Sequence, residues 1–270
     1  MPPAKKRPRP RTYDPAKIRP AVLGQFAHVR QAVAGLGTEV LGRPTRLAGW
    51  SVRDLALHLA EAVDVVARNL AEPPPPPPPL APPARPELTL LEWPFAEPVR
   101  PPAPPVDTAT GLGALYDDIA TRTARLLPEA PDTRLVSTRV GTMTLADHLV
   151  TRTVELCVHT DDLNDAVPGL DIPYERQALA ACTRLLADAL AAKAPGGSVE
   201  VRVPPYAVVQ CVEGPRHTRG TPPNVVETDP LTWLRLATGR RAWADEVEAA
   251  RIAASGERAD LSALLPVLSR

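Results

Sequence analysis

Three side chains of the kind that bind metal ions stand out in the sequence. Glu155 and His159 are four residues apart, and His58 lies far upstream of both. Positions i and i+4 share one face of a helix, so Glu155 and His159 can reach the same point. Two imidazoles and a carboxylate suit zinc or a similar divalent ion and leave a coordination position open. The three residues therefore predict a metal site at which chemistry can occur.

The helix expected to carry Glu155 and His159 spans roughly residues 145–166. It begins with Thr144 and has Asp147 three residues later, a spacing in which a side-chain oxygen caps free backbone N–H groups. Polar residues then form one stripe that apolar residues border on both sides. The stripe consists of His148, Arg152, Glu155, His159 and Asp162. Because an unpaired charge is costly in apolar surroundings, a metal ion would explain such a stripe.

A second helix, expected near residues 51–71, carries His58. Ser51 and Asp54 form another capping box at its start, and His58 shares a face with Leu55 and Ala62. Each feature also has an ordinary explanation. A lone histidine on an apolar face is usually a hydrogen-bonded core residue, and a glutamate four residues before a histidine is common by chance. The metal site is predicted from their conjunction.

Two further carboxylates are placed near the expected ligands. Asp162 lies one turn after His159, and Glu61 lies three residues after His58. A metal-bound imidazole commonly donates its other N–H to a carboxylate, which either residue could provide. The sequence favours solvated or capping roles for both, and neither is predicted to be a ligand.

The composition bounds the class of protein. The 270 residues have a formal net charge of zero, which argues against a nucleic-acid partner. No run of eighteen apolar residues exists, so no membrane span is expected, and the basic start has no apolar stretch after it. Three cysteines without a Cys-x-x-Cys motif suit reduced thiols. We expect a cytoplasmic protein.

The pattern of elements predicts two domains. Residues 1–12 should be a disordered basic tail, and 13–195 a four-helix bundle that contains a proline-rich, extended insertion at 73–105. Leu90, Leu91, Trp93 and Phe95 are expected to dock that insertion onto the bundle. Residues 196–270 should form a small α+β domain. The other helices are expected near 15–36, 108–127, 174–193, 230–238, 242–248 and 260–268, and extended segments near 134–140, 199–203, 207–212, 224–227 and 249–254.

Two stretches of the chain resemble a known family, the mycothiol-dependent maleylpyruvate isomerases. They are Trp50-Ser51-Val52-Arg53-Asp54-Leu55 with His58, and Glu155-Leu156-Cys157-Val158-His159 with Asp161, Asp162 and Leu163 after it. The resemblance implies a DinB-like four-helix bundle whose metal ligands are His58, Glu155 and His159. The end of the chain resembles the sterol-carrier-protein-like domain that follows the bundle in many members. Its motifs are Asp229-Pro230-Leu231-Thr232-Trp233-Leu234, Gly239-Arg240 and Ala254-Ser255-Gly256-Glu257.

The family implies a zinc-dependent enzyme that uses mycothiol, a small thiol, on a small electrophilic substrate. A divalent ion deprotonates a thiol that binds it, and the thiolate is the nucleophile. In an isomerase the thiolate would add to an activated cis double bond, allow rotation and leave, whereas in a transferase it would stay attached. Arg216, Arg219 and Arg240 could hold a substrate carboxylate, or could be surface residues.

Two other functions remain open on the sequence. The protein could be a non-enzymatic carrier, in which the second domain binds a lipid or other apolar ligand and the metal site is vestigial. Alternatively, the proline-rich segment could be a docking arm for a partner protein. Loss of turnover on chelation would favour the enzyme, whereas co-purified lipid without any thiol effect would favour the carrier.

Overall fold

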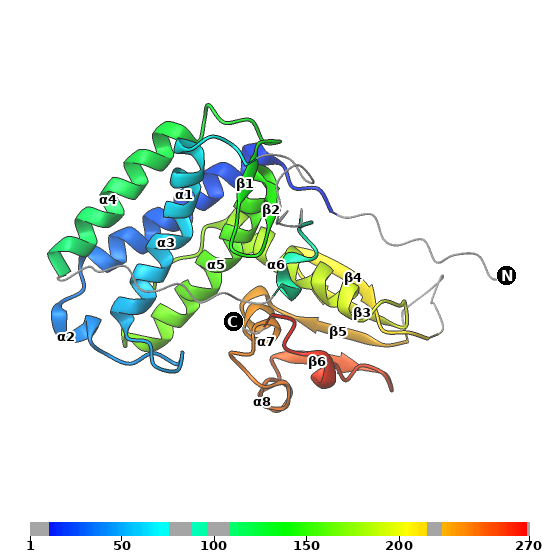
Figure 1. The fold of residues 1–270 in the computed structure, drawn as a ribbon. Helices are drawn as coiled ribbons and strands as arrows, with labels where there is room; N and C mark the ends of the chain where they lie inside the picture. Colours follow the sequence, from blue (N-terminus) through cyan, green and yellow to red (C-terminus); the bar gives the residue numbers. More distant parts are fainter. Residues whose placement is uncertain (1–10, 76–87, 97–108, 215–222, 269–270) are drawn as a thin grey trace.

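The computed structural model of the chain describes residues 11–75, 88–96, 109–214 and 223–268. Four long helices form the bundle: α1 (Pro15–Ala34), α3 (Val52–Ala71), α4 (Ala109–Leu126) and α5 (Leu145–Ala166). Helix α1 packs against α4 and α5, and α3 packs against the same two helices, so both ligand-bearing helices lie inside the bundle (Figure 1). The expected four-helix arrangement is confirmed.

Side-chain caps set where these helices begin. Ser51 accepts a hydrogen bond from the backbone N–H of Asp54, whose carboxylate in turn accepts from the N–H of Ser51. Thr144 caps α5 by accepting from the N–H of Asp147 at 3.2 Å. Because these caps satisfy N–H groups that a helix leaves free, they fix the register of His58 and of Glu155 along their helices.

Aromatic packing joins three helices near the ligand helix α3. The rings of Phe26 on α1 and Tyr116 on α4 stack with centroids 5.0 Å apart. The Tyr116 hydroxyl donates a 2.6 Å hydrogen bond to the carbonyl of Ala56 on α3. Both rings are fully buried. They hold the N-terminal part of α3, two residues before His58, against the other helices.

A small hairpin leads into α5. Strand β1 (Leu135–Ser137) pairs antiparallel with β2 (Thr142–Thr144), and β2 continues directly into the helix. The sequence predicted extended chain near β1 but not its partner. Two further short elements were not expected either, α2 (Thr38–Leu41) and the 3-10 turn η1 (Trp93–Phe95).

The described part of the proline-rich segment docks on the bundle in part as expected. Leu90 and Trp93 are buried, and the N–H of Leu88 donates to the carbonyl of Thr142. Leu91 is partly buried, whereas Phe95 is 47% exposed and does not dock. Residues 76–87 and 97–108 lie outside the described residues.

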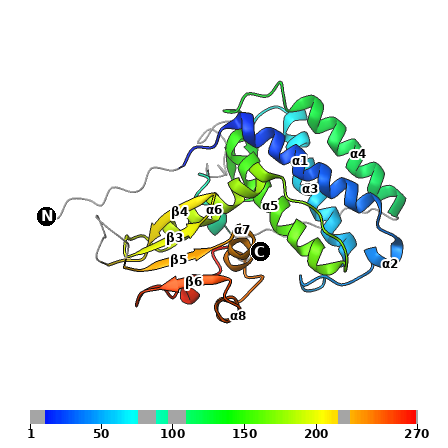
Figure 2. The ribbon, with the colours of Figure 1, turned by 180° about the vertical axis from the view of Figure 1, so that it is seen from behind.

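Helix α6 (Arg176–Lys193) connects the bundle to a four-stranded sheet. It packs against α5 and α1 on one side and against β4 and α7 on the other, so bundle and sheet lie side by side (Figure 2). The strand order is β4-β3-β5-β6, with β3 parallel to β5 and the other pairs antiparallel. The elements are β3 (Val199–Val203), β4 (Ala207–Cys211), β5 (Val225–Thr228), α7 (Pro230–Ala237), α8 (Trp243–Glu248) and β6 (Ile252–Ser255).

The two faces of this sheet differ in character. In β3, Val199, Val201 and Val203 are buried, while Glu200 and Arg202 between them are partly exposed. Arg202 forms ion pairs with Glu200 and with Glu227 of β5 on the outer face. The alternation follows from the two-residue period of a strand, and it turns the valines toward the helices. The predicted α+β architecture is confirmed.

The end of the chain differs from the expectation. The predicted helix 260–268 is wrong, because residues Ser262–Leu264 form only a short 3-10 turn, η2. Pro266 lacks a backbone N–H and disfavours helical backbone at Leu265, which is extended. The strand expected at 249–254 begins later, at Ile252, because α8 ends at Glu248 and Ala250 adopts a positive φ of 56°.

Among the helices in the described part of the chain, none combines the length and the apolar character needed to cross a membrane.

Candidate metal centre

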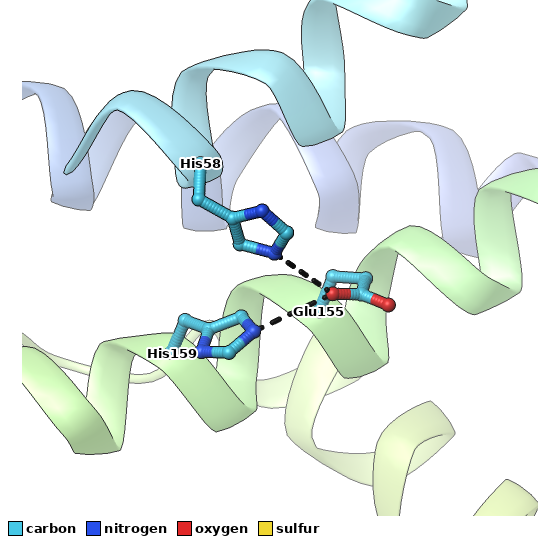
Figure 3. A group of neighbouring side chains, drawn as sticks. All are labelled: His58, Glu155 and His159. Atoms are coloured by element: carbon cyan, nitrogen blue, oxygen red, sulfur yellow. Dashed lines mark hydrogen bonds and ion pairs between the residues drawn. The ribbon is translucent and has the colours of Figure 1, made fainter. Parts of the chain in front are cut away.

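The structure brings the three predicted ligands together. His58 projects from α3, Glu155 and His159 project from α5, and both imidazoles point at the same carboxylate (Figure 3). Nε2 of His58 lies 3.3 Å from Oε2 of Glu155, and Nε2 of His159 lies 3.5 Å from the same oxygen. One donor atom from each residue can be chosen so that all lie within 4.8 Å of one another.

These distances fit a tetrahedral ion. With metal-ligand bonds of about 2.0–2.2 Å, neighbouring ligand atoms of a tetrahedral zinc site are roughly 3.3–3.5 Å apart. The two measured nitrogen-to-oxygen separations fall in that range. The two imidazole rings are nearly perpendicular, with an interplanar angle of 88°. Three protein donors leave the fourth tetrahedral position for a small ligand.

The electrostatics of the three groups also suit a cation. Burial alone would raise the pKa of Glu155, but hydrogen bonds from His159 and His58 outweigh it and hold that pKa well below its usual range. Burial lowers the pKa of His58, which favours its neutral form. Burial would likewise lower the pKa of His159, but the carboxylates of Asp162 and Glu155 raise it instead. A cation bound here would replace the protons that the two imidazoles share with Glu155, because metal ligands must be deprotonated.

His159 has a carboxylate behind it. Its Nδ1 lies 2.7 Å from Oδ2 of Asp162, one turn further along α5, and the Asp162 side chain is fully buried. Burial would raise the pKa of Asp162, but hydrogen bonds from His159 and Arg240 outweigh it and lower that pKa well below its usual range. The ionised carboxylate thus orients the ring whose Nε2 faces Glu155.

Comparison with protein families identifies the helical region. The family model described as the mycothiol maleylpyruvate isomerase N-terminal domain matches residues 23–164, which is more than half of the chain. The chain belongs to this family. A second model, described as a bacterial SCP ortholog, matches residues 175–267, and so includes α6 with the sheet.

Solved structures agree with this mycothiol maleylpyruvate isomerase fold. The chain is similar to a crystal structure of the mycothiol-dependent maleylpyruvate isomerase, with a TM-score of 0.57, 16% sequence identity, and coverage of 92% of this chain and 95% of that one. A histidine-to-alanine mutant of that enzyme gives a TM-score of 0.56 at 15% identity, with the same coverage. No curated protein matches this chain by sequence. At these identities the likeness shows the fold.

In this family member, Glu61 does not support a ligand as Asp162 does. Glu61 pairs with Arg68 and Arg139 on the surface rather than with His58. His148 is 2% exposed, and its ring nitrogens have no hydrogen-bond partner among the described residues. It is not part of the candidate ligand group. The polar stripe on α5 therefore contains one buried imidazole beyond the site.

Of the three arginines considered for substrate binding, the structure describes only Arg240. Arg216 and Arg219 lie outside the described residues. Arg240 is described, and its guanidinium forks the carboxylate of Asp162, with Nε at 3.2 Å from Oδ1 and one terminal nitrogen at 3.0 Å from Oδ2. Its side chain is only 4% exposed. Arg240 is therefore engaged with the ligand helix.

Sequence reasoning missed the rest of this ion-pair network. Arg46, in the irregular chain before α3, bonds Asp162 at 2.6 Å and Asp161 at 2.5 Å. Arg235 of α7 grips Asp161, with its closest contact at 2.7 Å. The sequence did contain one signal for it: Asp161 and Asp162 are adjacent on a helix with apolar sides, and buried carboxylates require cations nearby. Nothing in the sequence identifies which arginines supply them.

The three cysteines are free and buried, and none belongs to the candidate ligand group. Burial raises the pKa of Cys157 well above its usual value, with the neighbouring Cys182 adding to the effect. Burial also raises the pKa of Cys211 to about 11. Thiols with raised pKa values are poor nucleophiles at neutral pH. A thiol-dependent reaction at this site would need a thiol from outside the chain.

Proposed function

We propose that this protein is a metal- and mycothiol-dependent enzyme, an isomerase or a transferase, that acts on a small electrophilic substrate. His58, Glu155 and His159 hold the divalent ion, and zinc is the ion that their donor set suits best. The observation that carries the proposal is the convergence of two imidazoles and one carboxylate from two helices at distances that fit one ion. Membership of the mycothiol maleylpyruvate isomerase family supports it.

The residues of the chain prepare the site for an external thiol. A divalent ion at this position supplies Lewis acidity, which lowers the pKa of a thiol that takes the open coordination position. Glu155 remains ionised, because hydrogen bonds from both imidazoles favour its charged form. Asp162 holds His159 with Nε2 toward Glu155. The chain contributes no thiol of its own, since its three cysteines are buried elsewhere.

In the isomerase reaction the thiolate sulfur adds to one carbon of a cis double bond that is conjugated to a carbonyl. The electron pair of the double bond moves toward the carbonyl oxygen, and the former double bond can then rotate. When the pair returns, the carbon-sulfur bond breaks, and the thiolate and the trans product leave. In a transferase the adduct is protonated instead and keeps its carbon-sulfur bond.

The carrier hypothesis gains nothing from the described structure. The apolar face of the sheet packs against α6, and the opposite face carries ion pairs such as Arg202 with Glu227. Apolar strand residues are therefore used as core. We include a cytoplasmic location in the proposal, which the three unpaired cysteines support because free thiols persist in reducing compartments.

Metal content in matched variants tests the proposal. We expect purified protein to contain one divalent ion per chain and the His58→Ala variant to contain almost none, by elemental analysis. His28→Ala is the control, because His28 is a histidine of α1 outside the candidate ligand group and hydrogen-bonds to the carbonyl of Pro173. Circular dichroism should show a folded bundle in both variants. Full metal content in His58→Ala would overturn the assignment of the ligands.

Mycothiol dependence needs a separate measurement. We expect turnover of a cis-configured conjugated acid to require mycothiol, to stop on chelation and to return when zinc is added. A metal-loaded protein that shows no thiol-dependent turnover and binds no mycothiol would refute the enzymatic part of the proposal.

A further inference from the structure

We propose that Arg240, together with Arg46, positions the metal ligand His159 through Asp162, so that the region after α6 completes the outer shell of the metal centre. This inference rests on the proposed function and adds a role for the second region of the chain. Arg240 is a positioning residue in this view, because it reaches the ligand only through the carboxylate of Asp162.

All four hydrogen-bond positions around the Asp162 carboxylate are used. Oδ2 accepts from His159 at 2.7 Å and from Arg240 at 3.0 Å. Oδ1 accepts from Arg46 at 2.6 Å and from Arg240 at 3.2 Å. Charge-assisted, forked contacts of this kind fix the plane of a carboxylate as well as its place. The oxygen that faces His159 therefore has little freedom to turn away.

This arrangement selects one tautomer of His159. An ionised carboxylate can only accept hydrogen bonds, so Nδ1 of His159 must be the nitrogen that donates. In the neutral ring Nε2 then carries the lone pair, and Nε2 is the atom that faces Glu155. The two arginines favour the ionised form of Asp162, because both place positive charge against a fully buried side chain. Nε2 of His159 therefore has a free lone pair directed toward the site in the metal-free protein.

Arg240 is itself held firmly in place. It follows Gly239, whose φ of 72° lets the chain turn sharply after α7. The N–H of Arg240 donates to the carbonyl of Arg235, and one terminal nitrogen donates to the carbonyl of Thr238 at 2.7 Å. The guanidinium therefore approaches Asp162 from a fixed backbone in the second region.

The neighbouring ion pair provides an internal control. Arg235 belongs to the same region and grips Asp161, which also accepts from Tyr174 and Arg46. In the described structure the side chain of Asp161 forms its hydrogen bonds with these three residues and not with His159. The pairs Arg235–Asp161 and Arg240–Asp162 should therefore contribute alike to cohesion between the two regions, and only the second should affect the ligand.

Zinc affinity in two pairs of variants tests the inference. The variants are Arg240→Gln and Asp162→Asn, with Arg235→Gln and Asp161→Asn as matched controls. Competition with a chromophoric chelator measures zinc affinity, and urea unfolding of the metal-free proteins measures cohesion. We expect a 10–100-fold loss of affinity in Asp162→Asn, as for other outer-shell partners, about tenfold in Arg240→Gln, and less than about twofold in both controls. Equal losses in Arg240→Gln and Arg235→Gln would overturn the inference.

Nitrogen-15 NMR of the metal-free protein gives a readout that does not depend on metal binding. At a pH where His159 is neutral, we expect the wild-type ring to be protonated on Nδ1 and the Arg240→Gln ring to be a mixture of tautomers. Arg235→Gln should match the wild type. An unchanged ring in Arg240→Gln would contradict the positioning role, whereas a wild-type protein that binds no zinc but shows these tautomers would contradict only the proposed function.

Discussion

The indole of Trp50 lies edge-on to the imidazole of His58, with ring centroids 5.1 Å apart. Trp50 directly precedes the capping box of α3, so the cap that starts the helix also places an aromatic ring beside a predicted ligand. The indole is partly exposed, and it packs against one side of the His58 ring. A fluorophore therefore stands next to the proposed metal position.

Trp50 should report the loading of the site. Open-shell cations quench a nearby indole, so titration with Co²⁺ should reduce the tryptophan fluorescence of the wild-type protein with a stoichiometry of one. In Trp50→Phe most of that change should disappear although the three other tryptophans remain. In His58→Ala the saturable change should be absent. A wild-type titration that Trp50→Phe reproduces would show that the cation binds elsewhere.

Local signals allowed much of the fold and the candidate ligands to be predicted from the sequence. The capping residues Ser51 and Thr144 mark the helix starts, and the four-residue spacing of Glu155 and His159 places both on one face. His58 could be added because its helix was equally clear. These predictions depend on short segments whose geometry the chain determines locally.

The ion-pair network depends on pairing between distant segments and could not be predicted in the same way. Arg46 and Asp162 are 116 residues apart, and Arg240 and Asp162 are 78 apart. Arg46 lies in irregular chain, where no period indicates which side of the molecule it faces. The predicted final helix is wrong for a different reason: Leu261, Leu264 and Leu265 have helical spacing, but Pro266 prevents the helix from continuing.

The native thiols should be unreactive. Cys157, Cys182 and Cys211 are each fully buried, and a disulfide reagent attacks only an accessible thiolate. We expect slow labelling by dithiobis-nitrobenzoate in native buffer and rapid release of three equivalents in urea. The three single Cys→Ala variants identify any exception. Fast labelling of one native thiol would supply an internal nucleophile and weaken the argument for an external one.

The cap of α3 should contribute measurably to stability. Ser51→Ala removes the oxygen that accepts from the N–H of Asp54 at 3.2 Å, and loss of such a cap costs about 1 kcal/mol. Urea denaturation should show this decrease in the free energy of unfolding without a change in the m-value. Ser255→Ala, at an exposed position of β6, is the control and should leave stability unchanged. Equal stability of Ser51→Ala and wild type would contradict the prediction.

His148 should make the fold sensitive to acid. Burial, and next the positive charge of Arg152, lower the pKa of His148 well below its usual value, although Glu155 opposes them. The unfolded chain therefore takes up a proton that the folded chain resists, so stability falls as the pH drops below about 6.5, the ordinary pKa of histidine. Between pH 7.5 and 5.5 this residue should account for at most about 1.4 kcal/mol.

The variant His148→Leu isolates that contribution, because a leucine of similar size fills the space and does not titrate. Its free energy of unfolding, measured in urea on metal-free protein, should fall less between pH 7.5 and 5.5 than that of the wild type. At pH 7.5 the variant should be at least as stable, since both ring nitrogens of His148 lack hydrogen-bond partners in the described structure. The side chain of His148 is only 2% exposed, so it should accept a proton less easily than an exposed histidine does. Parallel pH profiles of the free energy of unfolding for the two proteins would contradict this prediction.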